Sequence, residues 1–315
     1  MLNHRVVSAT ALSTKQVLCQ ARLKNDLSLI RRVIGDAYDD LFMLPNFLII
    51  GAPRSGTTWL EKNLRSHPDV FMPGIKELHF FNKHYDRGLP WYEAHFEEAV
   101  SFKAVGEATP GYLHGFVYDN QKERNVAERI KECLPDAKLI VSLRDPVERA
   151  YSRYLNSKAR FDTNKEKSFE QQLSDSPEFI AEGMYFDQLS RYLCFFPPEQ
   201  IQILLYDDLV QNPVSYMQKV YEFLGLRSDI ETGWESVKVN RETSKGNLAR
   251  FQTLDFLSRA LGRTGLHGFA ESVMQFNSLE QEPMSPETRR QLSDIYQEQN
   301  RQLAKMIGRD LSSWT

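Results

Sequence analysis

The sequence predicts an α/β protein of three layers, with a central, mainly parallel sheet flanked by helices on both faces. Short apolar runs alternate along the chain with segments of helical periodicity, which is the order that a parallel sheet requires. The run from Lys138 to Leu143 is almost continuously apolar, as is typical of a strand covered on both faces. With 41% hydrophobic and 26% charged residues, the composition is that of an ordinary globular chain.

The stretch NFLIIGAPRSGTTWLEKNL, residues 46–64, predicts the first strand, a tight loop and the first helix. The apolar run Phe47–Ile50 stops at Gly51, and helical periodicity begins near Thr57. The backbone N–H groups of such a loop and of the helix start point toward one spot and bind an anion, most often a phosphate. Gly51 and Gly56 have the glycine spacing of the nucleotide-binding P-loop, so we expect a P-loop-like fold.

The loop departs from the P-loop of ATP and GTP hydrolases at its central cation. Thr57 occupies the position of the usual Lys, whereas Thr58 stands where that motif has its hydroxyl. The fixed positive charge of the loop is Arg54, whose guanidinium can bind a phosphate-like anion through two N–H groups. The missing Lys weakens the case for an ordinary nucleotide hydrolase. A strand-to-helix turn without a ligand is the structural alternative.

A carboxylate and an imidazole follow at a spacing of two residues. The segment from Lys76 to Phe81 is short and aromatic, and we expect it to be extended. In an extended chain Glu77 and His79 lie on one face, where they would form an acid–base pair beside the anion loop. The alternative is a surface Glu beside a His at the edge of the core.

The later elements continue the alternation. Helical patterns and apolar runs predict a short strand running into a loop within residues 103–115, a helix over 121–133, strands over 138–143 and 201–206, and helices over 184–196, over 213–224 and after Ser285. Arg144 follows the 138–143 strand at its carboxyl end, where open parallel sheets bind their ligands. Asp145 and Pro146 are typical of a helix start, and Ser152 lies on that helix. Arg144 and Ser152 can thus serve a second anion, unless Arg144 is purely structural.

Two regions lie outside this regular pattern. Residues 1–45 hold an amphipathic helical pattern, which we interpret as a packing helix added before a single domain over 46–315; a membrane-surface or partner helix is the alternative. Residues 227–283 are irregular and rich in polar loops. They are expected to form either a variable lid over an acceptor site or a plain surface excursion.

Charge and cysteine content limit the partners and the compartment. The net charge of −3 gives no general attraction to nucleic acid or to anionic membranes, so an anion site has to be a local basic pocket. The three cysteines lack the spacing of a disulfide framework or a metal site, and a reducing cytosol suits them. No signal peptide and no run of eighteen apolar residues are seen, so we expect a soluble, cytoplasmic protein without a membrane span or a metal.

Three of these segments follow one another along the chain: APRSGTTWL, KELHFFN and KLIVSLRDPVERAYSRY. Together they resemble the sulfotransferases that use 3′-phosphoadenosine 5′-phosphosulfate (PAPS), within the branch of the heparan sulfate sulfotransferases and many bacterial relatives. The resemblance covers roughly residues 45–225, with weaker similarity in the later Lys-Gly loop and the C-terminal helix.

The resemblance implies roles for individual residues. Glu77 would be the general base with His79 beside it, and Arg54 would contact the reacting group. The resemblance assigns PAPS binding to the loop residues, to the 3′-phosphate site and to the Lys-Gly loop: Arg54, Ser55, Gly56, Thr57, Thr58, Trp59, Arg144, Ser152, Lys245 and Gly246. The chain departs from the heparan sulfate enzymes at Ala108, where they have a Lys. Either Lys76 or Lys83 substitutes for it, or the acceptor is not heparan sulfate.

The function expected from this resemblance is transfer of a sulfuryl group from PAPS to a hydroxyl or amine of a carbohydrate, a lipid or a secondary metabolite. The reaction would leave adenosine 3′,5′-bisphosphate. Two alternatives stay open at this point. One is a P-loop kinase or NTPase, and the other is a catalytically inactive nucleotide-binding scaffold. The acceptor and the oligomeric state are not indicated by the sequence.

Overall fold

The computed structural model describes residues 43–115, 125–160, 167–229, 248–249, 278–279 and 283–314. Its core is a five-stranded sheet with the order β2-β3-β1-β4-β5, in which every neighbouring pair is parallel. The strands are β1 (Phe47–Gly51), β2 (Val70–Phe71), β3 (Ala104–Ala108), β4 (Lys138–Leu143) and β5 (Ile201–Leu205). The predicted α/β fold is confirmed.

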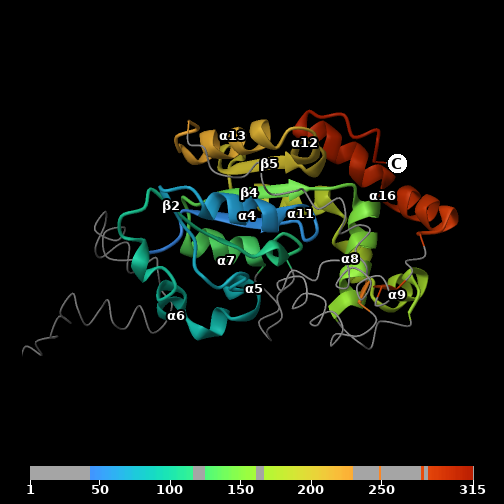
Figure 1. Cartoon of the computed structure of the whole chain (residues 1–315), viewed down its shortest axis with the longest axis horizontal. Coiled ribbons are helices and arrows are strands. Elements are labelled where there is room, and N and C mark those ends of the chain that lie inside the picture. Colours follow the sequence, from blue (N-terminus) through green and yellow to red (C-terminus); the bar gives the residue numbers. More distant parts are fainter. Residues whose placement is uncertain are drawn as a thin grey trace, which may run out of the picture.

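Helices cover both faces of this sheet (Figure 1). The α-helices of the described residues are α4 (Thr57–Arg65), α5 (Phe80–Lys83), α6 (Leu89–Glu93), α7 (Val126–Cys133), α8 (Pro146–Arg160), α9 (Phe169–Asp175), α10 (Glu178–Ala181), α11 (Tyr185–Leu193), α12 (Tyr206–Gln211), α13 (Pro213–Leu224) and α16 (Pro286–Ile307). None of the helices in the described part of the chain is long and apolar enough to span a membrane.

Strand β1 shows why three layers form. All its residues are buried, and alternate side chains enter two different hydrophobic clusters. Phe47 and Ile49 pack with α4 and α13, whereas Leu48 and Ile50 pack with α7 and α11. A continuous apolar strand therefore supplies the core on both sides of the sheet. Gly51 is the last residue of β1, and this position needs glycine because a Cβ atom there would lie 2.5 Å from Leu113 Cβ.

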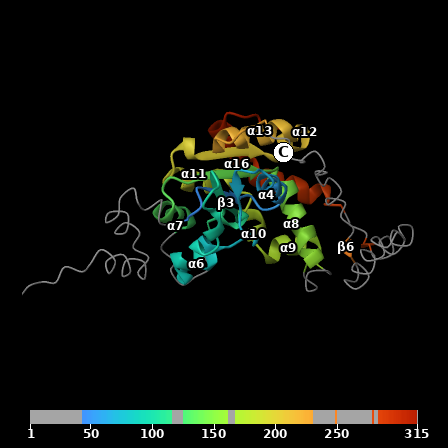
Figure 2. The same ribbon diagram turned by 60° about the vertical axis from the view of Figure 1, so that its left-hand side comes forward.

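Helix α8 leads away from the carboxyl end of β4 and joins a third cluster. Asp145 caps its start, since Asp145 Oδ1 accepts a hydrogen bond of 2.8 Å from the Val147 N–H. Val147 and Ala150 pack there with Phe169 of α9 and Tyr296 of α16. Helices α8 and α9 lie side by side beyond the sheet in both ribbon views (Figures 1 and 2). This packing positions α8 so that its polar residues Ser152 and Asn156 contact Arg54 in the loop after β1.

The segment before α5 differs from the prediction. It is not an extended strand, because Glu77 and His79 have φ values of 60° and 54°. The Glu77 N–H donates to Ala108 O at 3.1 Å, and the His79 N–H donates to Thr109 Oγ1 at 3.3 Å. The segment thus wraps the end of β3 in a left-handed turn, and burial of Phe80 anchors it. The prediction of an extended chain was wrong.

Several predicted features fall outside the described residues. These are nearly all of the N-terminal extension, the start of the 121–133 helix, Lys245 and Gly246, and most of the 227–283 region. Within that last region, β6 (Leu248–Ala249) and β7 (Ser278–Leu279) form an antiparallel pair.

Candidate active site

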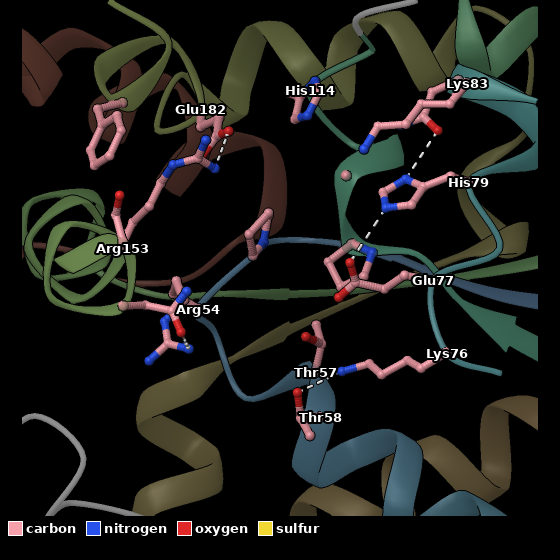
Figure 3. Close-up of a pocket in the computed structure, with 17 residues that line it drawn as sticks. Arg54, Thr57, Thr58, Lys76, Glu77, His79, Lys83, His114, Arg153 and Glu182 are labelled. Atoms are coloured by element: carbon pink, nitrogen blue, oxygen red, sulfur yellow. Dashed lines mark hydrogen bonds and ion pairs between the residues drawn. The ribbon is translucent and has the colours of Figure 1, made fainter. Parts of the chain in front are cut away.

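A cavity of about 720 Å³ lies where the loops after β1 and β3 meet the segment before α5 and the side of α8 (Figure 3). Its lining is mostly polar and charged: Pro53, Arg54, Thr57, Thr58, Lys76, Glu77, His79, Asn82, Lys83, Pro110, Gly111, His114, Arg153, Asn156, Ser157, Phe179 and Glu182. Among the described residues, no group of three His, Cys, Asp or Glu side chains is arranged to hold a metal ion. The cavity brings together the predicted anion loop and the predicted acid–base pair.

The loop after β1 has the shape of an anion cradle. Gly56 is the N-cap residue of α4, with φ of 85°, and no side chain caps this helix. Glycine suits this position because its φ is left-handed and because a Cβ atom would lie 2.8 Å from Leu209 Cδ2. The first N–H groups of a helix lack acceptors within the helix. Because no side chain caps α4, its first turn and the hydroxyls of Thr57 and Thr58 together have the form of an anion cradle.

Arg54 extends from this loop toward α8. Its Nε donates to Ser152 Oγ at 3.1 Å, and its Nη1 donates to Asn156 Oδ1 at 3.3 Å. Arg54 has a left-handed φ of 68°, which directs its side chain away from the first turn of α4 (Figure 3). The sequence placed Ser152 with Arg144, whereas in the structure Ser152 contacts Arg54.

Arg144 packs on an aromatic ring that also contacts the anion loop. Its guanidinium carbon is 5.0 Å from the ring centroid of Tyr206, and its Nη2 is 3.7 Å from Glu148 Oε2. A Cβ atom on Gly56 would lie 3.1 Å from Tyr206 Cδ2, so the same ring packs beneath the anion loop. Tyr206 thus links Arg144 to that loop.

Two further residues of the predicted donor site are buried. Trp59 lies in the first turn of α4, and Ser55 lies in the loop, directly before Gly56.

Glu77 and His79 meet although their segment is not a strand. His79 Nε2 is 3.5 Å from Glu77 Oε2, and His79 Nδ1 is 3.2 Å from Asn82 Oδ1. The Glu77 side chain is 47% exposed, so its carboxylate reaches the cavity, whereas Asn82 is buried. This series of contacts orients the imidazole against a carboxylate that can accept a proton. Asn82 was missed by the sequence reasoning, although it follows His79 at the i+3 spacing of a helix.

Both lysines proposed as substitutes for the missing family Lys line the cavity. Lys76 Nζ donates to Thr58 Oγ1 at 2.6 Å, which brings the ammonium to the first turn of α4. Lys83 lies in the last turn of α5, one turn beyond His79. Ala108 itself is buried at the end of β3.

A buried carboxylate supports the acid–base segment from below. Glu107 of β3 accepts hydrogen bonds from Tyr92 (2.9 Å), Thr109 (2.7 Å) and Tyr112 (2.8 Å). Burial raises the pKa of the Glu107 carboxyl, and these hydroxyl donors oppose the shift. Glu107 was also missed by the sequence reasoning. The available signal was an acidic residue inside the otherwise small and apolar strand AVGEA.

A second buried charged group forms the wall near α8. Glu182 accepts a hydrogen bond from Arg149 Nη1 at 2.9 Å and also forms an ion pair with Arg153.

The same arginines affect a histidine that lines the cavity. Burial, together with the positive charges of Arg153 and Arg149, lowers the pKa of His114 to about 3. His114 is therefore neutral at pH 7 and adds no charge to the cavity.

Comparisons with known proteins agree with this geometry. The sequence profile described as "Sulfotransferase domain" matches residues 44–304. Heparan sulfate glucosamine 3-O-sulfotransferase 3B1 of Mus musculus is 32% identical, over 85% of this chain and 64% of that protein. The membrane-associated sulfotransferase kil1 of Dictyostelium discoideum is 28% identical, over 59% of this chain and 57% of that protein.

A solved structure is similar over most of both chains. The crystal structure of a sulfotransferase from Alicyclobacillus acidocaldarius aligns with a TM-score of 0.62 and 26% identity, covering 86% of this chain and 98% of that chain. The chain spans less than two thirds of the length of the two relatives named above. The profile match covers far more than half of the 315 residues, and the chain belongs to the sulfotransferase domain family.

Proposed function

We propose that this protein transfers a sulfuryl group from PAPS to a hydroxyl or amine of a polar acceptor. The observation that supports this most is the composition of one cavity. It joins an anion cradle at the start of α4, cationic side chains and the Glu77–His79 pair. Transfer of a sulfuryl group from a phosphate oxygen to an acceptor oxygen or nitrogen needs these three components in one place.

The donor would bind along the loop after β1. Its 5′-phosphosulfate needs hydrogen-bond donors and positive charge, which the first turn of α4, Thr57, Thr58 and Arg54 supply. Arg144, which packs on the ring of Tyr206, is suited to the 3′-phosphate. Ser152 would act with Arg54, given their hydrogen bond. Lys245 and Gly246 stay predictions for the same phosphate, because they lie outside the described residues.

The step itself is a direct displacement at sulfur. The acceptor oxygen or nitrogen forms a bond to sulfur while the bond from sulfur to the leaving 5′-phosphate oxygen breaks. Glu77 accepts the acceptor proton, and His79 orients the carboxylate. The negative charge that moves to the leaving phosphate, in adenosine 3′,5′-bisphosphate, is stabilised by the N–H groups and cations of the cradle.

The lining favours a carbohydrate among the possible acceptors. Apart from Pro53, Pro110, Gly111 and Phe179, every residue that lines the cavity has a charged or hydrogen-bonding side chain. A lipid tail would leave those polar groups without partners, at a cost in free energy. The mouse relative acts, by its name, on a glucosamine of heparan sulfate, and a sugar hydroxyl is the acceptor that we propose here. A kinase or NTPase is not favoured, because Thr57 replaces the Lys that would contact ATP.

Ligand-dependent melting tests the donor. A ligand that binds only the folded state raises the melting temperature. We expect adenosine 3′,5′-bisphosphate to raise the melting temperature of this protein, and ATP or GTP to raise it far less, because they lack a 3′-phosphate. Stabilisation by ATP without stabilisation by the bisphosphate would overturn the proposal in favour of a kinase.

A further inference from the structure

We propose that Lys76 is a catalytic residue of this transfer, whose ammonium neutralises the charge that develops on the leaving phosphate oxygen. This inference rests on the proposed sulfuryl transfer and assigns the cation that the P-loop-like sequence lacks at Thr57. The main evidence is a hydrogen bond of 2.6 Å that Lys76 Nζ donates to Thr58 Oγ1. Thr58 belongs to the first turn of α4, so the charge of Lys76 lies at the anion cradle itself.

The position of this ammonium points to an anionic ligand. The N-terminus of a helix carries a partial positive charge, which disfavours a neighbouring cation and favours an anion. Lys76 adds a full positive charge to that end, while no side chain caps the helix. An anion bound between the ammonium and the N–H groups would be stabilised by both. A phosphate oxygen that gains charge as its bond to sulfur breaks fits this position.

The backbone fixes Lys76 beside the residue proposed as the base. The Glu77 N–H donates to Ala108 O at 3.1 Å, which attaches this segment to the end of β3. The left-handed turn at Glu77 sends the two neighbouring side chains in different directions. Lys76 points to Thr58 at the cradle, and Glu77 points to His79 (Figure 3). One turn can therefore supply the cation at the leaving group and the base at the acceptor.

Two other cations of the cavity are placed differently. The Nε and Nη1 groups of Arg54 are hydrogen-bonded to Ser152 and Asn156 of α8. Lys83 lies near His79, at the opposite end of Figure 3 from Thr58. Arg54 thus connects the cradle to α8, and Lys83 lies toward the acceptor side. Lys76, by contrast, donates a hydrogen bond to the first turn of α4.

The test compares lysine variants in the full chain. Lys76→Gln removes the charge, Lys76→Arg keeps it, and Lys83→Gln removes the competing cation. Lys62→Gln is the matched control, because Lys62 is exposed in the last turn of the same helix α4. Each variant is assayed for transfer of labelled sulfate from PAPS, for release of labelled sulfate to water, and for binding of adenosine 3′,5′-bisphosphate.

We expect Lys76→Gln to lower kcat by roughly 100- to 1000-fold, the loss typical of a missing charge-stabilising group. The KM for PAPS should change by less than about tenfold, since the interaction strengthens in the transition state. Lys76→Arg should recover part of the loss, and the melting temperature and bisphosphate binding should stay close to wild type. Lys62→Gln should behave as wild type, and Lys83→Gln should lose less than about tenfold.

The outcomes separate this inference from the proposed function. If the wild-type protein neither binds the bisphosphate nor cleaves PAPS, the proposed function is overturned, and the inference falls with it. If the wild type is active and Lys76→Gln stays within threefold of it, Lys76 is not catalytic, although the proposed function stands. A large loss in Lys83→Gln without one in Lys76→Gln would assign the cation to Lys83 and overturn the inference.

Discussion

At the scale of single residues, the side chain of Glu77 is about half exposed and its carboxylate contacts His79. We therefore expect Glu77 to act as the general base. Changing Glu77 to Gln keeps the size of the side chain and removes its ability to accept a proton. General-base groups contribute roughly 100- to 10,000-fold to rates, so we expect a loss of turnover in that range. Binding of adenosine 3′,5′-bisphosphate, measured by calorimetry, should stay unchanged. Wild-type turnover in Glu77→Gln would show that the base is another group.

At the scale of elements, the end of β3 supports the segment that carries the pair. Thr109 Oγ1 donates to Glu107 and accepts from the His79 N–H, so one hydroxyl joins the buried carboxylate to the turn. Tyr112 makes the equivalent link, because its hydroxyl donates to Glu107 and accepts from the Phe81 N–H at 3.4 Å. Glu107 thus orients two hydroxyls, whose oxygens accept hydrogen bonds from the backbone of the turn that carries Glu77 and His79. Thr109 is a positioning residue in this arrangement.

Removing that hydroxyl should loosen the turn. Thr109→Val leaves the His79 N–H and one Glu107 oxygen without this partner, and we expect the free energy of unfolding to fall by about 1–3 kcal/mol. Because misplacement of reacting groups costs up to about 100-fold, kcat should fall by roughly 10- to 100-fold while the KM for PAPS changes little. Thr109→Ser keeps the hydroxyl and should restore most of kcat. Equal kcat in both variants would mean that Thr109 only stabilises the fold.

Local signals explain which elements the sequence could predict. The strand, loop and helix from Phe47 to Arg65 follow from apolar periodicity and from glycine, and the start of α8 follows from Asp145 and Pro146. The segment around Glu77 was predicted with the wrong backbone. Left-handed φ values at residues other than glycine are uncommon, and here they are stabilised by hydrogen bonds to β3, which no local pattern encodes.

The contacts that complete the site depend on distant residues. Arg54 and Ser152 are 98 positions apart, and Lys76 meets Thr58 across 18 positions. The Glu107 cluster combines Tyr92 from α6 with Thr109 and Tyr112 from the loop after β3. Motif similarity could name Glu77, Arg54 and Thr58 as candidates. Which cation contacts Thr58, and what holds the turn, are properties of the folded chain.

At the scale of the whole molecule, His114 couples stability to pH. Burial and the nearby Arg153 and Arg149 lower the pKa of His114 to about 3, below the value of about 6.5 for a free His. The unfolded chain therefore binds a proton between these two values while the folded chain does not. Its neutral form stabilises the fold fully above pH of about 6.5, and this contribution is lost as the pH falls toward 3.

Substitution of His114 should remove this part of the acid sensitivity. Linkage predicts that wild type loses roughly 2 kcal/mol through this group between pH 7 and pH 5. In urea denaturation, His114→Gln should lose less unfolding free energy than wild type over the same interval, by about that amount. Identical pH dependence of the two proteins would mean that His114 is not held neutral in the fold.

The described residues include one five-stranded sheet, and five segments of the chain line the cavity beside it. The chain belongs to the sulfotransferase domain family. The cytoplasmic location, the domain boundaries and the role of residues 1–45 stay predictions of the sequence. The central claim is that the cavity transfers a sulfuryl group from PAPS, with Glu77 as the base.

Transfer of labelled sulfate from PAPS to a panel of acceptors tests that claim most directly. The panel should pair a glucosamine-containing oligosaccharide with a lipid and a phenol, and each acceptor should be assayed with wild type and with Glu77→Gln. We predict labelled sulfate on the oligosaccharide with wild type, and little or none with Glu77→Gln, at equal binding of adenosine 3′,5′-bisphosphate. Bisphosphate binding without transfer to any acceptor or to water would contradict the account and indicate a nucleotide-binding scaffold.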